Sequence, residues 1–373
     1  MGKGKREANF ELLRIAAMFM VVVMHYLTNT IAVMPGGKGI QGLGAVYVIL
    51  ESFCIVAVNV YVLLSGYFLS VSVFSWKRVI RVIAQTLFYT VLIPPVLALL
   101  GILSFAEVTD IYRIWKSIFP VQSGHYWFVT AYVVMALFSP LLNAALKALD
   151  QKRLLQVTAG LLLFFCIGKS ISPLQFATDK YGYDFGWFLV LYLIGGYIRR
   201  FGAGFFDSMK KGAALYFASC ILIAAAELFL TFLYGRYGVL AYYWTVPFHY
   251  NFLPCLTGAL GLFFIFYHMH IEEGRLSGLI RFASPAVFGV YLIHEQNDVK
   301  ERWFAWVNAL TGKLGEVLGI GLGQQMEDGV AVTPVLPYLL ILLVQTLVVF
   351  VVCIAIDKAR GALFARIERR WSR

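Results

Sequence analysis

The chain has 373 residues, of which 60% are hydrophobic and 14% are charged, and its mean hydropathy is +0.77. Soluble globular domains carry about 25% charged residues, so this composition excludes an ordinary soluble protein. The net charge of +11 is dispersed over short segments between apolar runs, which disfavours a nucleic-acid partner and indicates a membrane protein.

Apolar runs of about 20 residues, long enough to cross a bilayer, follow one another along the chain. They predict an all-α integral membrane protein of about ten transmembrane helices, forming one polytopic domain over residues 1–373. The predicted helices cover 10–29, 46–70, 79–103, 126–147, 153–171, 185–201, 212–234, 246–269, 281–299 and 335–357. The Gly-rich stretch 300–333 is predicted as a long connection, which either lines a substrate entrance or is mobile.

Basic residues set the predicted orientation. If the N-terminus is cytoplasmic, the inside segments hold 22 of the 31 Lys and Arg residues, and the outside segments hold the other nine. This bias predicts that both termini are cytoplasmic, with a short basic cytoplasmic tail at 358–373. The five cysteines lie within apolar segments and form no close pair, so neither a disulfide framework nor a metal site is expected.

The first apolar segment carries two ionisable residues, Arg14 and His25, eleven positions apart. At 100° per residue, eleven steps return to nearly the same helix face, about 16 Å further along the axis. Ionisable side chains at membrane depth are costly unless they face a protein interior or a wet cavity. Both residues are therefore expected on one inward face, with Arg14 near the cytoplasmic end and His25 in the outer half.

Five further short motifs lie in the later segments. They are Ser65-Gly66-Tyr67, Arg78-Val-Ile-Arg81, His125-Tyr126-Trp127-Phe128, Phe185-Gly-Trp-Phe-Leu-Val-Leu-Tyr192 and Phe288-Gly-Val-Tyr291-Leu-Ile-His294-Glu295. Together with Arg14-x10-His25, these motifs and their order resemble the membrane-bound acyltransferase-3 family. The resemblance covers residues 10 to 295, and the last helix matches only as a hydrophobic segment.

This resemblance implies transfer of an acyl group from cytoplasmic acyl-coenzyme A to a hydroxyl of a surface sugar. His25 is then the catalytic residue, either as a general base or as the residue that takes the acyl group itself. Arg14, Arg78 and Arg81 are expected to bind the donor phosphates, because arginine offers planar bidentate donors. Ser65 and Tyr67 complete the expected donor site.

The expected acceptor site lies on the outer side and comprises Glu51, His125, Tyr126, Trp127, Tyr291 and His294. Structural roles compete with these assignments. A histidine on an apolar helix often makes only an interhelical hydrogen bond, and the positive-inside rule alone places arginines at Arg78 and Arg81. Glu51 either orients an imidazole or pairs with a polar neighbour. Trp127 either stacks on a sugar or belongs to the interfacial belt.

The resemblance therefore implies a multi-pass enzyme of the bacterial plasma membrane, an O-acyltransferase that is expected to use acetyl-coenzyme A as the donor. Its expected partners are a carbohydrate or lipid-linked glycan and membrane lipids, without nucleic acid or metal, and its oligomeric state stays open. The alternative is a proton-coupled secondary transporter of a small or lipid-linked anionic solute, which would use the same Arg, His and Glu residues.

Overall fold

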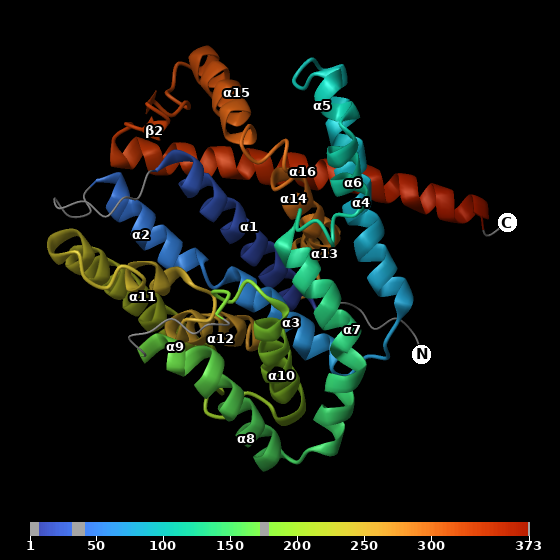
Figure 1. Ribbon diagram of the computed structural model, residues 1–373, viewed down its shortest axis with the longest axis vertical. Helices are drawn as coiled ribbons and strands as arrows, with labels where there is room; N and C mark the ends of the chain where they lie inside the picture. Colours follow the sequence, from blue (N-terminus) through green and yellow to red (C-terminus); the bar gives the residue numbers. More distant parts are fainter. Residues whose placement is uncertain (1–6, 32–41, 172–178, 372–373) are drawn as a thin grey trace. The chain divides into compact units, whose positions relative to one another are not determined.

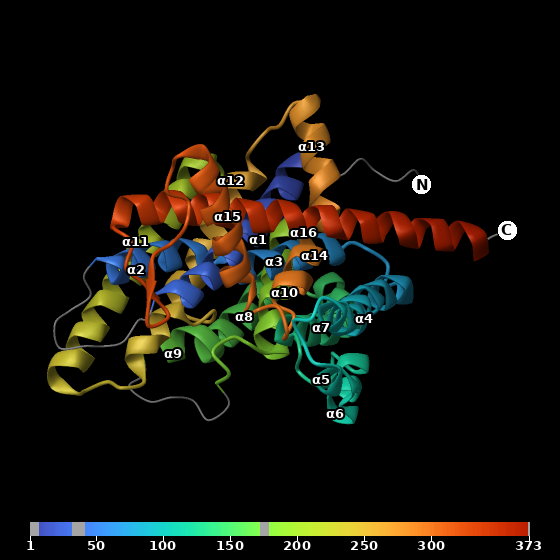
Figure 2. The ribbon, with the colours of Figure 1, turned by 90° about the horizontal axis from the view of Figure 1, so that it is seen from above.

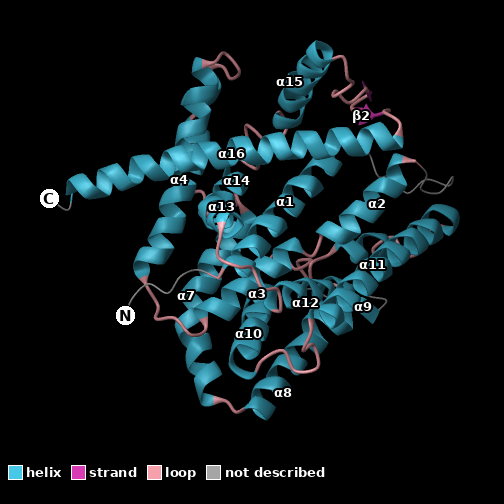
Figure 3. Ribbon diagram, turned by 180° about the vertical axis from the view of Figure 1, so that it is seen from behind, coloured by secondary structure: helices cyan, strands magenta, loops and turns pink. Residues whose placement is uncertain are grey.

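The computed structural model describes residues 7–31, 42–171 and 179–371. Helices account for most of the described chain, which also contains one two-stranded hairpin (Figure 3). Nine helical segments in this part of the chain are long and apolar enough to span a membrane. The predicted all-α membrane fold class is confirmed. Five basic residues that the predicted topology counts lie outside the described residues, namely Lys3, Lys5, Arg6, Lys38 and Arg373.

The predicted segment 185–201 forms a helix with those bounds, α10 (Phe185–Phe201). Its 17 residues cover about 26 Å at 1.5 Å per residue, slightly less than a hydrocarbon core of about 30 Å. Together with the nine longer segments, α10 accounts for all ten predicted helices.

The helices form two compact units, and each unit joins segments that lie far apart in the sequence. Unit 1 comprises Met1–Ala32, Ala84–Tyr126 and Glu272–Arg373, and unit 2 comprises Val33–Ile83 and Trp127–Ile271.

Unit 1 contains the first and last helices of the chain, α1 and α16, which pack against each other and against α14 (Figures 1 and 2). Its elements are α1 (Ala8–Thr30), most of α4 (Trp76–Leu99), α5 (Phe105–Thr109), α6 (Ile111–Ile118), α13 (Arg275–Ala283), η3 (Ser284–Ala286), α14 (Val287–His294), α15 (Trp303–Leu318), β1 (Met326–Glu327), β2 (Val330–Ala331) and α16 (Val335–Trp371). The antiparallel strands pair Met326 with Ala331 and Glu327 with Val330.

Unit 2 is built around α3 against α10 and α11 against α12. Its elements are α2 (Leu43–Cys54), α3 (Ala57–Leu69), the start of α4, α7 (Trp127–Ala148), α8 (Gln151–Leu162), the π-helix η1 (Leu163–Ile167), α9 (Gly168–Ile171), α10, α11 (Met209–Tyr237), η2 (Tyr243–Phe248) and α12 (Leu253–Tyr267). Glycines let these helices approach closely. A Cβ atom on Gly66 would lie 2.4 Å from the Tyr192 carbonyl oxygen, and one on Gly195 would lie 2.4 Å from the Leu63 carbonyl oxygen.

Several predicted boundaries are wrong. The segment 46–70 is divided into α2 and α3, and 246–269 starts in η2 and continues as α12 only from Leu253. The segment 281–299 is not one helix: Pro285 falls in the 3₁₀ turn between α13 and α14, and α14 already ends at His294. The predicted connection 300–333 contains α15, a helix of 16 residues. The last helix does not end at 357 but continues as α16 to Trp371, because no proline interrupts its polar, helix-favouring end.

Candidate active site

The site begins on α1, which runs unbroken from Ala8 to Thr30 and so carries Arg14 and His25 on one helix, as predicted. In unit 1 this helix packs against α13, α14 and α16. The His25 side chain is 27% exposed, which leaves part of the imidazole accessible.

The nearest polar partner of His25 is His294, at the end of α14. The His25 Nδ1 atom lies 2.8 Å from His294 Nε2, and the two ring centroids are 5.1 Å apart. His294 is 1% exposed, so it stands behind the accessible His25 imidazole. His25 and His294, which were both predicted toward the outer side, are therefore in direct contact.

The second nitrogen of His294 fixes the direction of this hydrogen bond. His294 Nδ1 lies 2.6 Å from the backbone carbonyl oxygen of Val290, which can only accept. In a neutral imidazole Nδ1 therefore carries the proton, and Nε2 accepts a hydrogen bond from His25 Nδ1. The Nε2 atom of neutral His25 is thus left with a lone pair, which is the arrangement that a general base needs.

Glu295 follows His294 in the sequence and completes the cluster. Its Oε1 atom lies 3.1 Å from His25 Nδ1, and its side chain is 25% exposed. A carboxylate at this distance favours the protonated form of the imidazole, so it stabilises the charge that forms when His25 takes a proton. The sequence motif contained Glu295, but adjacency to His294 along a helix gave no indication that its carboxylate would turn toward α1.

The turn that follows α14 explains how the Glu295 side chain reaches His25. The Gln296 side chain accepts a hydrogen bond from the Asp298 backbone N–H at 2.6 Å and donates one to the Asp298 carboxylate at 3.1 Å. Such local side-chain bonds compete with helix continuation, so α14 ends and Glu295 can turn back.

Three more predicted acceptor residues lie beside this turn in unit 1. Both ring nitrogens of His125 approach Asn297, at 3.3 and 3.2 Å, and burial lowers the pKa of His125 to about 4. His125 is therefore neutral at pH 7. The Tyr126 hydroxyl donates to the Leu292 carbonyl at 2.6 Å, and its ring lies 5.5 Å from that of Tyr291.

The donor atoms of His25, His294 and Glu295 all lie within 4.8 Å of one another, and two histidines with a carboxylate are a common metal-ligand set. Two nitrogens bound to one tetrahedral zinc ion at about 2.0–2.1 Å would stand about 3.3 Å apart. The observed 2.8 Å is a hydrogen-bond distance, so the present arrangement fits a proton relay better than a metal centre.

Comparison with known proteins identifies the family of the chain. The family model described as an acyltransferase domain, Acyl_transf_3, matches residues 7–357. The chain belongs to the acyltransferase-3 family. No curated protein and no solved structure matches it. The protein is therefore a multi-pass membrane acyltransferase, and the family gives no support to the alternative of a transporter.

Arg14, the predicted donor residue of this acyltransferase on α1, has an intramolecular partner. Its guanidinium forms an ion pair with Glu11, one turn earlier, and Glu11 also accepts a hydrogen bond from Ser284 in η3. The Arg14 side chain is 28% exposed. Glu11 and Ser284 therefore hold the Arg14 side chain toward η3, and part of it remains accessible.

The other predicted donor residues belong to unit 2. Arg78 donates to the Ser72 hydroxyl at 3.1 Å, and Arg81 is exposed. The Ser65 hydroxyl donates within its own helix to the Tyr61 carbonyl at 2.9 Å. Tyr67 accepts a hydrogen bond from Arg199 at 2.9 Å, with the guanidinium 4.8 Å from the ring centre. The positive-inside pattern alone assigned Arg199 a topological role, and its contact with Tyr67 adds it to the candidate donor residues of this acyltransferase.

Two predicted acceptor residues, Glu51 and Trp127, also lie in unit 2. Glu51 is 6% exposed, and its Oε2 atom has no hydrogen-bond partner among the described residues. Trp127 stacks on Tyr250 with centroids 5.7 Å apart and lies 4.5 Å from the Tyr183 ring. Within unit 1, the groups that contact the His25 imidazole are His294 and Glu295.

Proposed function

We propose that this acyltransferase moves an acyl group, and specifically acetyl, from cytoplasmic acyl-coenzyme A to a hydroxyl of an extracytoplasmic or lipid-linked carbohydrate. The observation that carries the proposal is the hydrogen-bond chain from Val290 through His294 to His25. It leaves the Nε2 lone pair of a partly exposed imidazole free to accept a proton.

In the proposed reaction, His25 Nε2 takes the proton of the acceptor hydroxyl as its oxygen attacks the thioester carbonyl carbon. The tetrahedral intermediate collapses, the C–S bond breaks, and the thiolate of coenzyme A leaves. The imidazolium then returns the proton to that sulfur, which restores neutral His25. Glu295, 3.1 Å from His25 Nδ1, stabilises the imidazolium between these two steps.

The donor phosphates are assigned to Arg14, Arg78 and Arg81, which the predicted topology places at the cytoplasmic side, together with Arg199 and Tyr67. Arginine suits this role because its guanidinium binds phosphate oxygens in a bidentate manner. The distance of about 16 Å along α1 from Arg14 to His25 leaves room for an extended donor between phosphate site and reacting thioester.

The direct test uses purified protein in liposomes with acetyl-labelled acetyl-coenzyme A and a lipid-linked oligosaccharide. The label should appear on the oligosaccharide, and free coenzyme A should be released in step with it. A transporter would leave acetyl-coenzyme A intact. Intact donor in the presence of folded, membrane-inserted protein would refute the proposal.

Sidedness is tested in sealed vesicles of known orientation. Donor should be consumed only from the cytoplasmic side, and the acylated product should appear on the opposite side. In a background without native cysteines, Gln122→Cys should react with an impermeant thiol reagent from outside, and Met209→Cys only after lysis. Reversed labelling would overturn the proposed orientation in the bacterial plasma membrane.

A further inference from the structure

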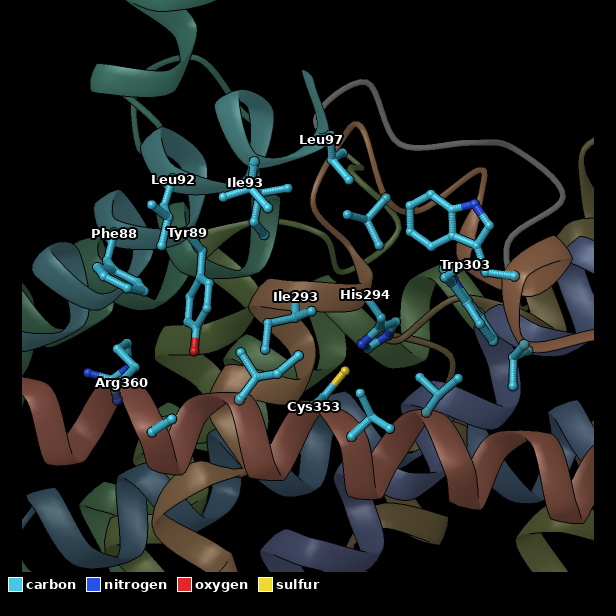
Figure 4. Close-up of a pocket in the computed structure, with 18 of the residues that line it drawn as sticks. Phe88, Tyr89, Leu92, Ile93, Leu97, Ile293, His294, Trp303, Cys353 and Arg360 are labelled. Atoms are coloured by element: carbon cyan, nitrogen blue, oxygen red, sulfur yellow. The ribbon is translucent and has the colours of Figure 1, made fainter. Parts of the chain in front are cut away.

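A long apolar pocket of about 600 Å³ lies in unit 1 among α4, α15 and α16. Figure 4 shows Tyr89 and Arg360 toward one end, Trp303 at the other, and His294 between them. Nearly all of its lining is hydrocarbon, with α16 contributing a floor of small and β-branched side chains such as Val349, Cys353 and Ala359.

The pocket follows one face of α16. The lining positions on this helix repeat at intervals of one, three and four residues from Val348 to Leu363, which is the spacing of one helical stripe. This stripe is about 22 Å long at 1.5 Å per residue, roughly three-quarters of a hydrocarbon core of about 30 Å. Such a shape fits a single linear hydrocarbon chain better than a compact solute.

The wall of the pocket reaches the reacting centre. His294 lines the pocket, and its Nε2 atom is the one bonded to His25 at 2.8 Å. A chain lying in the pocket would therefore pass directly behind the catalytic pair. An ordinary lipid-facing groove elsewhere on the protein would have no such relation to the chemistry.

A cluster of basic residues adjoins the end of the pocket that Trp303 lines. Val299 and Trp303 line the pocket, and Lys300 and Arg302 lie between them in the chain. Arg302 donates to the Asp298 carbonyl at 3.0 Å, and Arg113 pairs with the Asp298 carboxylate. The positive charges of Lys116 and Lys300 are close enough to His125 to lower the pKa of its imidazole.

Acidic groups face this basic cluster as well. The Glu107 carboxylate lies 3.7 Å from the Arg113 guanidinium, and the Glu295 carboxylate is close enough to Lys300 for the two charges to attract each other. Even so, the predicted topology leaves only nine basic residues outside, and four of these nine gather here. The full set of nine is Lys38, Arg113, Lys116, Lys169, Lys180, Arg236, Lys300, Arg302 and Lys313. Because the positive-inside rule does not favour basic residues at this side, their concentration points to an anionic ligand.

We propose that this pocket binds the acceptor as a lipid-linked glycan, with one long isoprenoid or alkyl chain along α16 and its phosphate at Arg113, Lys116, Lys300 and Arg302. The sugar attached to that phosphate would then lie next to His25 Nε2. This inference rests on the proposed transfer to a carbohydrate hydroxyl and narrows its substrate: the glycan is acylated while still attached to its lipid carrier.

Binding is tested with a geranylgeranyl phosphate that carries a photoreactive diazirine on its chain. Val352 lines the pocket and is 48% exposed, whereas its neighbour Val351 is 60% exposed and lies off the lining. Val352→Trp should reduce photolabelling of α4 and α16 peptides at least fivefold, and Val351→Trp should leave it unchanged. Equal labelling in both variants would overturn the proposal.

Competition separates the proposed ligand from bulk lipid. Unlabelled geranylgeranyl phosphate should displace the probe, whereas phosphatidylglycerol at the same concentration should not. Displacement by both to the same extent would identify the pocket as a site for membrane lipid and refute the assignment. Lys300→Gln should weaken binding of the phosphate three- to tenfold without weakening that of geranylgeraniol, and Lys313→Gln on α15 should change neither. Equal loss for alcohol and phosphate would remove the phosphate site.

Turnover distinguishes this inference from the proposed function. Val352→Trp should lower transfer to a lipid-linked acceptor at least tenfold, while transfer to a short water-soluble glycan and hydrolysis of acetyl-coenzyme A stay within twofold. Loss confined to long-chain acyl-coenzyme A donors would assign the pocket to the donor and overturn the inference. If the wild type transfers to neither acceptor, the proposed function fails, and the photolabelling still decides what the pocket binds.

Discussion

The two units provide contrasting examples of how helices contact each other. In unit 1 long polar side chains bridge the helices: Tyr26 donates to Gln345 at 2.7 Å, and Asp357 accepts hydrogen bonds from Gln85 at 2.9 Å and from Tyr89 at 2.8 Å. In unit 2 the backbones of α3 and α10 meet directly at Gly66 and Gly195, where no side chain fits between them.

This difference relates to what each unit can do. Side-chain bridges keep helices apart, and unit 1 accordingly holds both the His25–His294 pair and the large apolar pocket beside it. Glycine contacts bring helices together, which makes a rigid seam and leaves little room for a ligand between them. The polar contacts in unit 1 therefore lie in the same unit as the candidate catalytic pair, whereas the close approach at Gly66 and Gly195 in unit 2 serves packing of α3 against α10.

The largest effect is expected from His25→Ala. Acyl transfer should fall by about 10²–10⁴-fold, the usual contribution of a general base, while donor binding persists. His268→Ala is the comparison variant in unit 2, because His268 Nε2 lies 2.7 Å from the backbone carbonyl oxygen of Phe206 and none of the candidate site residues contacts it in a described hydrogen bond. That variant should transfer at a near-normal rate. Similar rates for the two variants would make His25 a packing residue.

Packing in unit 2 is tested by Gly66→Ala. The added Cβ would lie 2.4 Å from the Tyr192 carbonyl oxygen, so the helices must separate, at a cost of about 1–3 kcal/mol. Gly160→Ala on α8 is the matched control, because nothing lies within 4 Å of its Cβ position. It should stabilise the protein by up to about 1 kcal/mol through helix propensity. Thermal unfolding in detergent measures both, and equal midpoints would disprove the tight seam.

Glu295→Gln tests the charge next to His25. Losing one charge-assisted contact of about 1.5 kcal/mol should slow transfer about tenfold. The acid limb of the rate profile should also move to lower pH, because the carboxylate no longer stabilises protonated His25. Glu301→Gln changes an exposed neighbour and should leave the profile in place. An unmoved acid limb in Glu295→Gln would argue for a purely structural carboxylate.

The smallest effect is expected from metal removal. If His25, His294 and Glu295 form a proton relay, dialysis against a chelator should leave the transfer rate unchanged. A loss of activity that zinc restores, together with bound zinc measured in the purified protein, would instead make the three residues metal ligands.

The sequence by itself determined the features that depend on local pattern. Runs of apolar residues specify membrane helices because backbone groups in lipid must bond within the helix, and α10 begins and ends where the pattern predicted. The eleven-residue spacing of Arg14 and His25 likewise follows from helix geometry alone once α1 is continuous. The motifs that resemble the family were sufficient to place the chain in it.

The tertiary structure decided which polar residues meet. His294 lies 269 positions from His25, and no periodicity links positions so far apart, so their 2.8 Å contact depends on how α14 packs against α1. Glu295 reaches His25 only because the chain leaves the helix after His294, where Gln296 and Asp298 bond to each other. The sequence of α16 did not predict the pocket, because apolar residues lie on the pocket face and on the exposed faces of this helix alike. Only the packing of α4 and α15 distinguishes the pocket face from the others.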